Sequence, residues 1–136
     1  LSKAVVFPDH HGDLLRSLKK RHRLAVVSNF DYAPMAWHIL EREGVAGLFE
    51  TVVVSDEVGW RKPKPVIFEL ALQRMGTAPG DALFVGDRAD IDVAGAHGVG
   101  MAAAWINRDG SPLPEGVQAP EFEIRDLAEL ERILSV

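Results

Sequence analysis

The chain has 136 residues, of which 47% are apolar and 26% charged, and it carries a formal net charge of −5 with no cysteine. This length predicts a single domain over residues 1–136 with a core of its own. The absence of cysteine excludes disulfides, a thiol nucleophile and cysteine-bound zinc, and it is compatible with the cytoplasm. The acidic balance argues against nucleic-acid binding, and no apolar run is long enough to span a membrane.

Short, continuously apolar runs predict strands that are covered on both faces, at residues 4–7, 24–27, 52–54, 82–85 and 102–106. Between them, apolar residues at helical spacing predict helices over residues 13–20, 36–43, 65–75, 91–97 and 127–134. Gly44 and Gly76 follow two of these helices and are expected to end them. Residues 107–120, rich in glycine and proline, predict a loop, and residues 1–8 predict an amino-terminal strand and linker.

Strands that alternate with helices predict an α/β fold, a doubly wound parallel sheet built from right-handed crossovers. In such sheets ligands bind beyond the carboxyl ends of the strands, so the residues that follow each strand matter most. Ser28 and Asn29 follow one predicted strand, Lys62 lies in the segment after another, and Asp87 and Asp92 follow a third. The sequence therefore predicts that a hydroxyl, an amide, a lysine and two carboxylates converge on one edge.

These residue types suit an anionic substrate held together with a hard divalent cation. Asp87, directly after a strand and a glycine, is expected to give a carboxylate oxygen to Mg²⁺. Asp92 is expected to hold a metal-bound water or to orient its neighbour. Ser28 can donate a hydrogen bond to a phosphate oxygen. Lys62 can neutralise the charge that builds on an attacking carboxylate and on the phosphoryl group.

Three segments within residues 8–108 together resemble the motifs of the haloacid dehalogenase (HAD) superfamily of phosphohydrolases. LAVVSNF resembles the second motif of that superfamily, with Ser28 as its hydroxyl residue. SDEVGWRKPKPVIFELAL resembles the third, in which Lys62 is the functional lysine. ALFVGDRADIDVAGAHGVGM resembles the fourth, with Asp87 and Asp92 as its acidic pair.

The resemblance implies a Rossmann-like core, Mg²⁺ as cofactor and hydrolysis through an aspartyl-phosphate, with a small phosphorylated metabolite as substrate. It implies that Ser28, Asn29 and Lys62 bind the substrate and act in catalysis together with Asp92, and that Asp87 and Asp92 hold the metal. One branch of the superfamily instead removes halide from 2-haloacids without a metal. That branch has Ser-Ser-Asn at the fourth motif, where this chain has Val85-Gly86-Asp87, so a phosphatase is favoured over a dehalogenase.

The first motif of the superfamily, Asp-x-Asp after an apolar strand, has no clear counterpart near the amino terminus. In the preferred interpretation, Pro8-Asp9 leads into the helix before the second motif, and the chain lacks both the nucleophile strand and the cap. In the other interpretation, residues 4–7 take the central strand position and Asp9 serves as a degenerate nucleophile. Loss of the central strand would expose apolar edges, so the sheet is then expected to be completed by residues 4–7, a homodimer partner or strand exchange. We therefore expect KAVVF (residues 3–7) to pair within the sheet.

Three functions remain open from the sequence. The complete enzyme is expected to be a Mg²⁺-dependent phosphatase, whereas an incomplete domain would bind metal, phosphate or a partner without turnover, and a haloacid dehalogenase is the third alternative. Among the other residues, Arg88 is expected to form a surface ion pair and His97 to be structural. Trp60 is expected either to line a substrate pocket or to pack on the scaffold.

Overall fold

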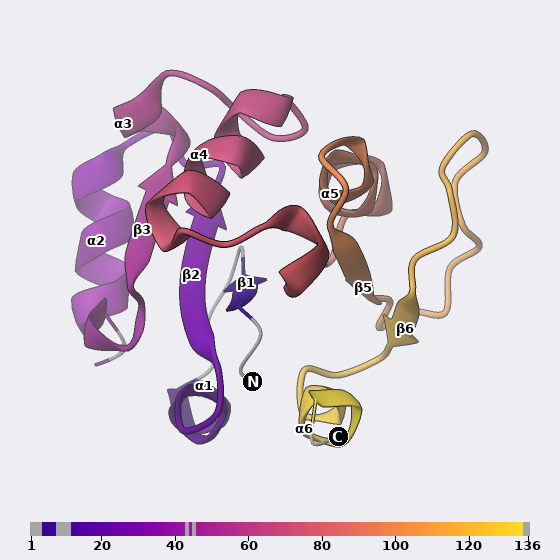
Figure 1. The fold of residues 1–136 in the computed structure, drawn as a ribbon, viewed down its shortest axis with the longest axis horizontal. Helices are drawn as coiled ribbons and strands as arrows, with labels where there is room; N and C mark the ends of the chain where they lie inside the picture. The colour runs from indigo at the N-terminus through magenta and orange to yellow at the C-terminus, as the bar shows by residue number, and fades with distance from the viewer. Residues whose placement is uncertain (1–3, 8–11, 43, 45, 135–136) are drawn as a thin grey trace.

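The computed structural model describes residues 4–7, 12–42, 44 and 46–134 of the chain (Figure 1). The amino-terminal half contains β1 (Ala4–Phe7), α1 (Gly12–Lys19), β2 (Arg23–Ser28), α2 (Ala33–Arg42), η1 (Ala46–Leu48), β3 (Thr51–Val54) and α3 (Ser55–Val58). The remainder contains α4 (Pro65–Met75), η2 (Pro79–Asp81), β4 (Ala82–Gly86), the π-helical turn η3 (Ala89–Val93), α5 (Ala94–Gly98), β5 (Ala102–Ile106), β6 (Phe122–Ile124) and α6 (Glu129–Leu134). Among these described residues, no helix is long and apolar enough to cross a membrane.

The strands form one six-stranded sheet in the order β3-β2-β1-β4-β5-β6, and every neighbouring pair is parallel. This is the order of doubly wound nucleotide-binding folds, in which the winding reverses between β1 and β4. The predicted fold class is therefore confirmed. Folds of this strand order bind ligands beyond the carboxyl ends of the two strands at the reversal.

The central strand β1 comes from the same chain. Phe7 is level with Val26 on β2, and Val6 is level with Phe84 on β4. The expectation that KAVVF pairs in the sheet is confirmed for residues 4–7, and Lys3 lies outside the described residues. The central position of residues 4–7 agrees with both interpretations, as the strand that precedes the nucleophile or as the replacement for a strand that the chain lacks. Both interpretations stay predictions. Asp9, the candidate degenerate nucleophile, lies outside the described residues.

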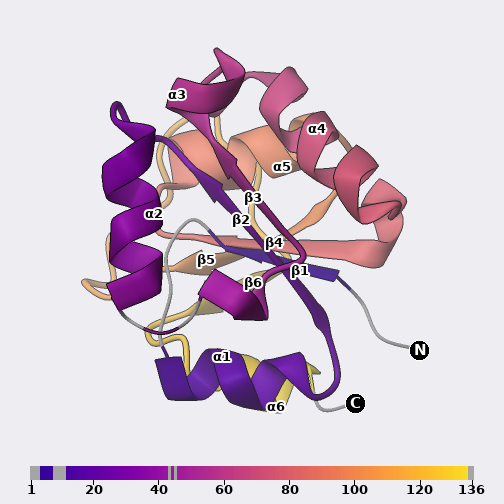
Figure 2. The same ribbon diagram turned by 90° about the vertical axis from the view of Figure 1, so that its left-hand side faces the viewer.

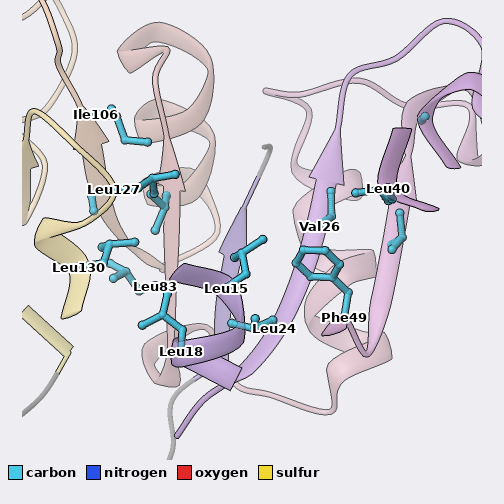
Figure 3. Close-up of a cluster of buried hydrophobic side chains, with 14 of the residues drawn as sticks. Leu15, Leu18, Leu24, Val26, Leu40, Phe49, Leu83, Ile106, Leu127 and Leu130 are labelled. Carbon is cyan, nitrogen blue, oxygen red and sulfur yellow. The ribbon is translucent and has the colours of Figure 1, made fainter. Parts of the chain in front are cut away.

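The two faces of the sheet are covered by different helices, because successive side chains of a strand point to opposite faces. Leu24 and Val26 of β2 pack with apolar residues of α1, α2 and α6 on one face. Ala25 and Val27 pack with α4 and α5 on the other. Figure 2 shows α1 and α6 along one side of the sheet and α4 and α5 along the other, and Figure 3 shows the first of these two cores.

Several elements differ from the sequence prediction, among them the helix expected over 91–97, which is the π-helical turn η3 followed by α5. Helix α2 begins at Ala33 rather than at 36, because the Ala33 N–H donates to Asp56 Oδ2 at 2.8 Å and thereby gains a cap. The short helix α3 and the edge strand β6 were not expected. In contrast, Gly44 and Gly76 have φ of 71° and 60°, which confirms that the helices before them end in left-handed glycines.

Candidate active site

A buried ion pair lies where β4 meets the segment after α3. Lys62 Nζ lies 2.9 Å from Asp92 Oδ1, and the two side chains are only 5% and 3% exposed. The ammonium also lies 5.5 Å from the centre of the Phe84 ring, within the range of a cation–π contact. Burial raises the pKa of the Asp92 carboxyl, against the opposing effects of Lys62 and of the Arg88 N–H. The pair fixes the position of the lysine, because an unpaired buried charge is strongly unfavourable.

The carboxylate of Asp92 also contacts the backbone of the loop after β4. Its Oδ2 accepts a hydrogen bond from the Arg88 N–H at 3.1 Å. Asp92 lies on η3, whose wider turn directs this side chain back toward the strand end. Gly86, the last residue of β4, leaves the space that the carboxylate occupies. The turn, the glycine and the lysine therefore hold Asp92 from three sides.

Asn29 positions the backbone of Lys62. Its Oδ1 accepts the Lys62 N–H at 2.8 Å, and its Nδ2 donates to the Lys62 carbonyl at 3.2 Å. Both ends of the amide are thus used within the protein. The structure shows that the Asn29 side chain joins the end of β2 to the loop that carries Lys62. The contact with substrate that the family resemblance implies stays a prediction.

Further hydrogen bonds fasten the loop after β2 to the segment after β3. Ser55 Oγ accepts from the Phe30 N–H at 2.8 Å and donates to the Phe30 carbonyl at 3.0 Å. Arg61 Nη1 lies 2.7 Å from Asp31 Oδ1. Together with Asn29, these contacts make the two loops one unit at the carboxyl edge of the sheet.

Among the described residues that the sequence predicted for the site, Ser28 and Asp87 remain available at this edge. Ser28 ends β2, and its hydroxyl makes no hydrogen bond to another described residue. Asp87 follows β4 and is exposed, while its backbone carbonyl accepts the Trp105 Nε1–H at 3.2 Å. The negative charge of Asp87 contributes to the raised pKa of Asp92, which indicates that the two carboxylates interact.

The donor set fits Mg²⁺, which takes oxygen ligands and needs only one or two protein carboxylates. Asp87 is the better ligand because its carboxylate is exposed and makes no hydrogen bond to the rest of the described chain. Asp92 has both oxygens engaged by Lys62 and Arg88. Within the part of the chain that the structure describes, no group of three or more His, Cys, Asp or Glu side chains forms a complete metal cage. The described residues therefore supply only part of the oxygen ligands that Mg²⁺ takes.

The other residues considered from the sequence have structural partners. Arg88 forms the expected surface ion pair, with Asp90 at 3.0 Å. His97 Nε2 lies 2.9 Å from Glu121 Oε1. Trp60 is half-exposed on the loop before Lys62. Sequence reasoning missed Gly86 as a contact of Asp92, because six residues of sequence separation give no sign of so close an approach.

Comparison with known proteins identifies the family of the chain. The profile of the haloacid dehalogenase-like hydrolases matches residues 1–100, and the chain belongs to this family. It is 34% identical to pyrimidine 5'-nucleotidase YjjG of Escherichia coli, over 89% of this chain and 53% of that protein. It is 40% identical to the glyceraldehyde 3-phosphate phosphatase of Methanothermobacter thermautotrophicus, over 76% of this chain and 45% of that protein.

Dehalogenases are also among the relatives. The chain is 32% identical to haloacetate dehalogenase H-2 of a Moraxella species, over 96% of this chain and 57% of that protein. Among solved structures, an HAD phosphatase from Thermococcus onnurineus superposes with a TM-score of 0.77 at 36% identity, over 89% of this chain and 54% of that one. The chain therefore spans about half the length of the relatives it matches.

Proposed function

We propose that this chain carries the phosphate- and metal-binding site of a Mg²⁺-dependent phosphomonoester hydrolase that acts on a small phosphorylated metabolite. The observation that carries the proposal is the fixed position of Lys62. Its ammonium pairs with Asp92 at 2.9 Å, and the backbone of Lys62 is hydrogen-bonded to the Asn29 side chain. The exposed carboxylate of Asp87 and the free hydroxyl of Ser28 lie at the ends of β4 and β2, the two strands that flank β1. As part of the same proposal we place the protein in the cytoplasm.

The proposed reaction has two steps. An aspartate oxygen attacks phosphorus, the bond from phosphorus to the ester oxygen breaks, and the ester oxygen takes a proton from water as the alcohol leaves. Water then attacks the aspartyl-phosphate at phosphorus, which releases inorganic phosphate and restores the carboxylate. Ser28 would donate to a phosphoryl oxygen, and Lys62 would offset negative charge on the attacking carboxylate and on the phosphoryl group. When bound at Asp87, Mg²⁺ would supply further positive charge opposite the phosphoryl oxygens.

Asp9 is the candidate for the attacking aspartate within this chain. It stands two positions after Phe7, the last residue of β1, in the sequence. Because β1 lies between β2 and β4, the residues after its carboxyl end are the ones that a doubly wound fold directs toward the ligand crevice. This assignment is proposed from the order of residues along the chain, and Asp9→Asn tests it separately from the metal site.

The test is hydrolysis of p-nitrophenyl phosphate with and without Mg²⁺. We expect metal-dependent turnover that Asp87→Asn abolishes, while Asp90→Asn, a matched change of an exposed carboxylate on the same turn, retains it. Asp9→Asn abolishes turnover if Asp9 is the nucleophile, and unchanged turnover in that variant excludes it. Binding of inorganic phosphate without turnover would instead support an incomplete domain. Metal-free halide release from a 2-haloacid would support a dehalogenase.

A further inference from the structure

Exposed apolar side chains gather on the elements that follow β2 and β3. In the described part of the chain, the large apolar residues that are most exposed are Tyr32, Met35, Trp60, Val66 and Phe122. The first four lie in the loop after β2, the first turn of α2, the loop after α3 and the first turn of α4. Exposed aromatic side chains near a polar site are common in ligand recognition, because they offer a large flat surface.

The ion pair described above joins the two loops that carry Tyr32 and Trp60. Tyr32 is 61% exposed and follows Asp31, and Trp60 is 47% exposed and precedes Arg61. The Asp31–Arg61 distance of 2.7 Å therefore places the backbones of the two aromatic residues on neighbouring loops. Because the two loops are hydrogen-bonded to each other, the aromatic residues are presented on a fixed backbone, which reduces the entropy lost on binding.

The aromatic residues also lie within reach of the phosphate site. Trp60 is two residues from Lys62, a separation that spans at most about 7 Å of extended chain. In the same segment Arg61 and Lys62 pair with Asp31 and Asp92, and Lys64 is exposed. An edge that combines exposed rings with a proposed phosphate-binding lysine is complementary to a ligand that is flat at one end and anionic at the other.

We propose that Trp60 and Tyr32 form a stacking surface for the base of a nucleoside monophosphate whose phosphate binds at Ser28 and Lys62. The inference rests on the proposed function and names its substrate class. The ribose separates the base from the phosphate, which matches a ring surface two residues away from the phosphate-binding lysine. Arylphosphates share the chemistry of ring and phosphate but carry the ring directly on the ester oxygen, so they reach Trp60 less well.

The test compares uridine 5′-monophosphate, O-phosphotyrosine and glycerol 3-phosphate. Affinities are measured by calorimetry with EDTA present, and kcat/KM is measured with Mg²⁺. We expect Trp60→Ala to weaken uridine 5′-monophosphate about tenfold in both measurements, within the range that base stacking on an aromatic side chain contributes. The affinity and kcat/KM for glycerol 3-phosphate should change by less than about twofold in Trp60→Ala. Trp60→Phe should retain most of the affinity for uridine 5′-monophosphate. Phe122→Ala, a matched loss of an exposed aromatic side chain on the edge strand β6, should leave the affinity for both ligands unchanged.

Several results would overturn the inference. These are an equal loss for uridine 5′-monophosphate and glycerol 3-phosphate, no loss for either, or a loss confined to O-phosphotyrosine. Selective loss of nucleotide binding in a chain that hydrolyses nothing would support the inference and contradict the proposed function. If the chain hydrolyses these substrates and Trp60→Ala affects all of them equally, only the inference is contradicted. A chain that binds none of the three ligands would contradict both.

Discussion

The carboxylate of Asp92 lies against the α-carbon of Gly86, so close that a β-carbon at Gly86 would come within 2.3 Å of Asp92 Cγ and Oδ2. No side chain fits between them, because real β-carbons essentially never approach other heavy atoms to less than 3.0 Å. Gly86 ends β4 and Asp92 lies on η3, so this contact sets how closely the turn packs on the strand end. The glycine is required here for space.

Gly86→Ala is therefore expected to displace Asp92 and, with it, Lys62. We expect a loss of stability of about 1–3 kcal/mol, which is typical of overpacking, and at least about a tenfold loss of phosphatase activity. Urea unfolding and kcat/KM measure the two effects. The control is Gly98→Ala, since a β-carbon at Gly98 meets nothing within 4 Å. Wild-type activity in the Gly86 variant would contradict the role assigned to this contact.

Lys62→Met is expected to destabilise the protein in a pH-dependent manner. The substitution leaves the Asp92 carboxylate buried without its cation, and loss of one partner of a buried pair typically costs about 3–5 kcal/mol. Burial already raises the pKa of Asp92, and Lys62 opposes that rise, so its removal raises the pKa further. A raised folded-state pKa means that stability is lost as the pH rises from the unfolded-state pKa through the folded-state pKa.

The deficit of Lys62→Met relative to the wild type should thus be largest at neutral pH and shrink toward acid pH, where Asp92 is protonated. Urea unfolding at a series of pH values measures it. Lys64→Met removes an exposed lysine two residues away and should leave stability nearly unchanged at every pH. A deficit that does not vary with pH would show that Asp92 does not carry the effect.

Asn29→Ala is expected to lower kcat more than it raises KM. The change removes both hydrogen bonds from the amide to the Lys62 backbone, at 2.8 and 3.2 Å, and so lets the lysine move. Small misplacements of this kind cost about tenfold or more in rate. Asn29→Asp keeps the acceptor for the Lys62 N–H but loses the donor, and should be intermediate. If Asn29→Ala raises KM alone, Asn29 contacts substrate directly, as the sequence had indicated.

The sequence was sufficient for five of the six strands and for the residues that follow them, because both depend on local patterns. A continuously apolar run marks a strand with two covered faces, and residues 24–27 and 82–85 both became buried strands. The residues that follow such strands must lie at one edge, which identified Ser28 and Asp87. The strand β6 was missed because two of its three residues are exposed and it has no apolar run.

Contacts between distant segments could not be predicted in this way. Asp56 caps α2 across 23 residues of sequence, and Asn29 binds Lys62 across 33. A local pattern shows that a polar residue follows a strand, but it does not show where that side chain points. The partner of each group is set by the packing of the two loops, which is a property of the folded chain.

Glu50→Gln is expected to lower stability slightly at neutral pH and to have a smaller effect at acid pH. Arg23 donates to Glu50 through Nε at 2.9 Å and Nη2 at 2.8 Å, and it also contacts the Met75 carbonyl, so the pair joins β2 to the end of α4. The hydrogen bond from Arg23 lowers the pKa of Glu50. The stability from this shift is present above the unfolded-state pKa and is lost as the pH falls through the folded-state pKa.

The effect at Glu50 should be small because both side chains are more than a third exposed and water screens them. Thermal unfolding of Glu50→Gln and wild type at pH 7 and pH 3 measures it. Asp90→Asn breaks a pair within one turn, which joins no separate elements, and should change the melting temperature less. A larger effect at pH 3 than at pH 7 would contradict the assignment.

Val6→Pro is expected to abolish cooperative folding. Val6 is level with Ala25 on β2 and with Phe84 on β4, so β1 uses its backbone groups on both sides. Proline has no N–H to donate, and it is tolerated in sheets at edge strands and at strand starts but not in central strands. Phe122→Pro, at the start of the edge strand β6, is the matched control and should remain folded. Circular dichroism and urea unfolding separate the two outcomes. If Val6→Pro unfolds no more readily than Phe122→Pro, residues 4–7 do not form the central strand in solution, and that strand would have to come from another chain.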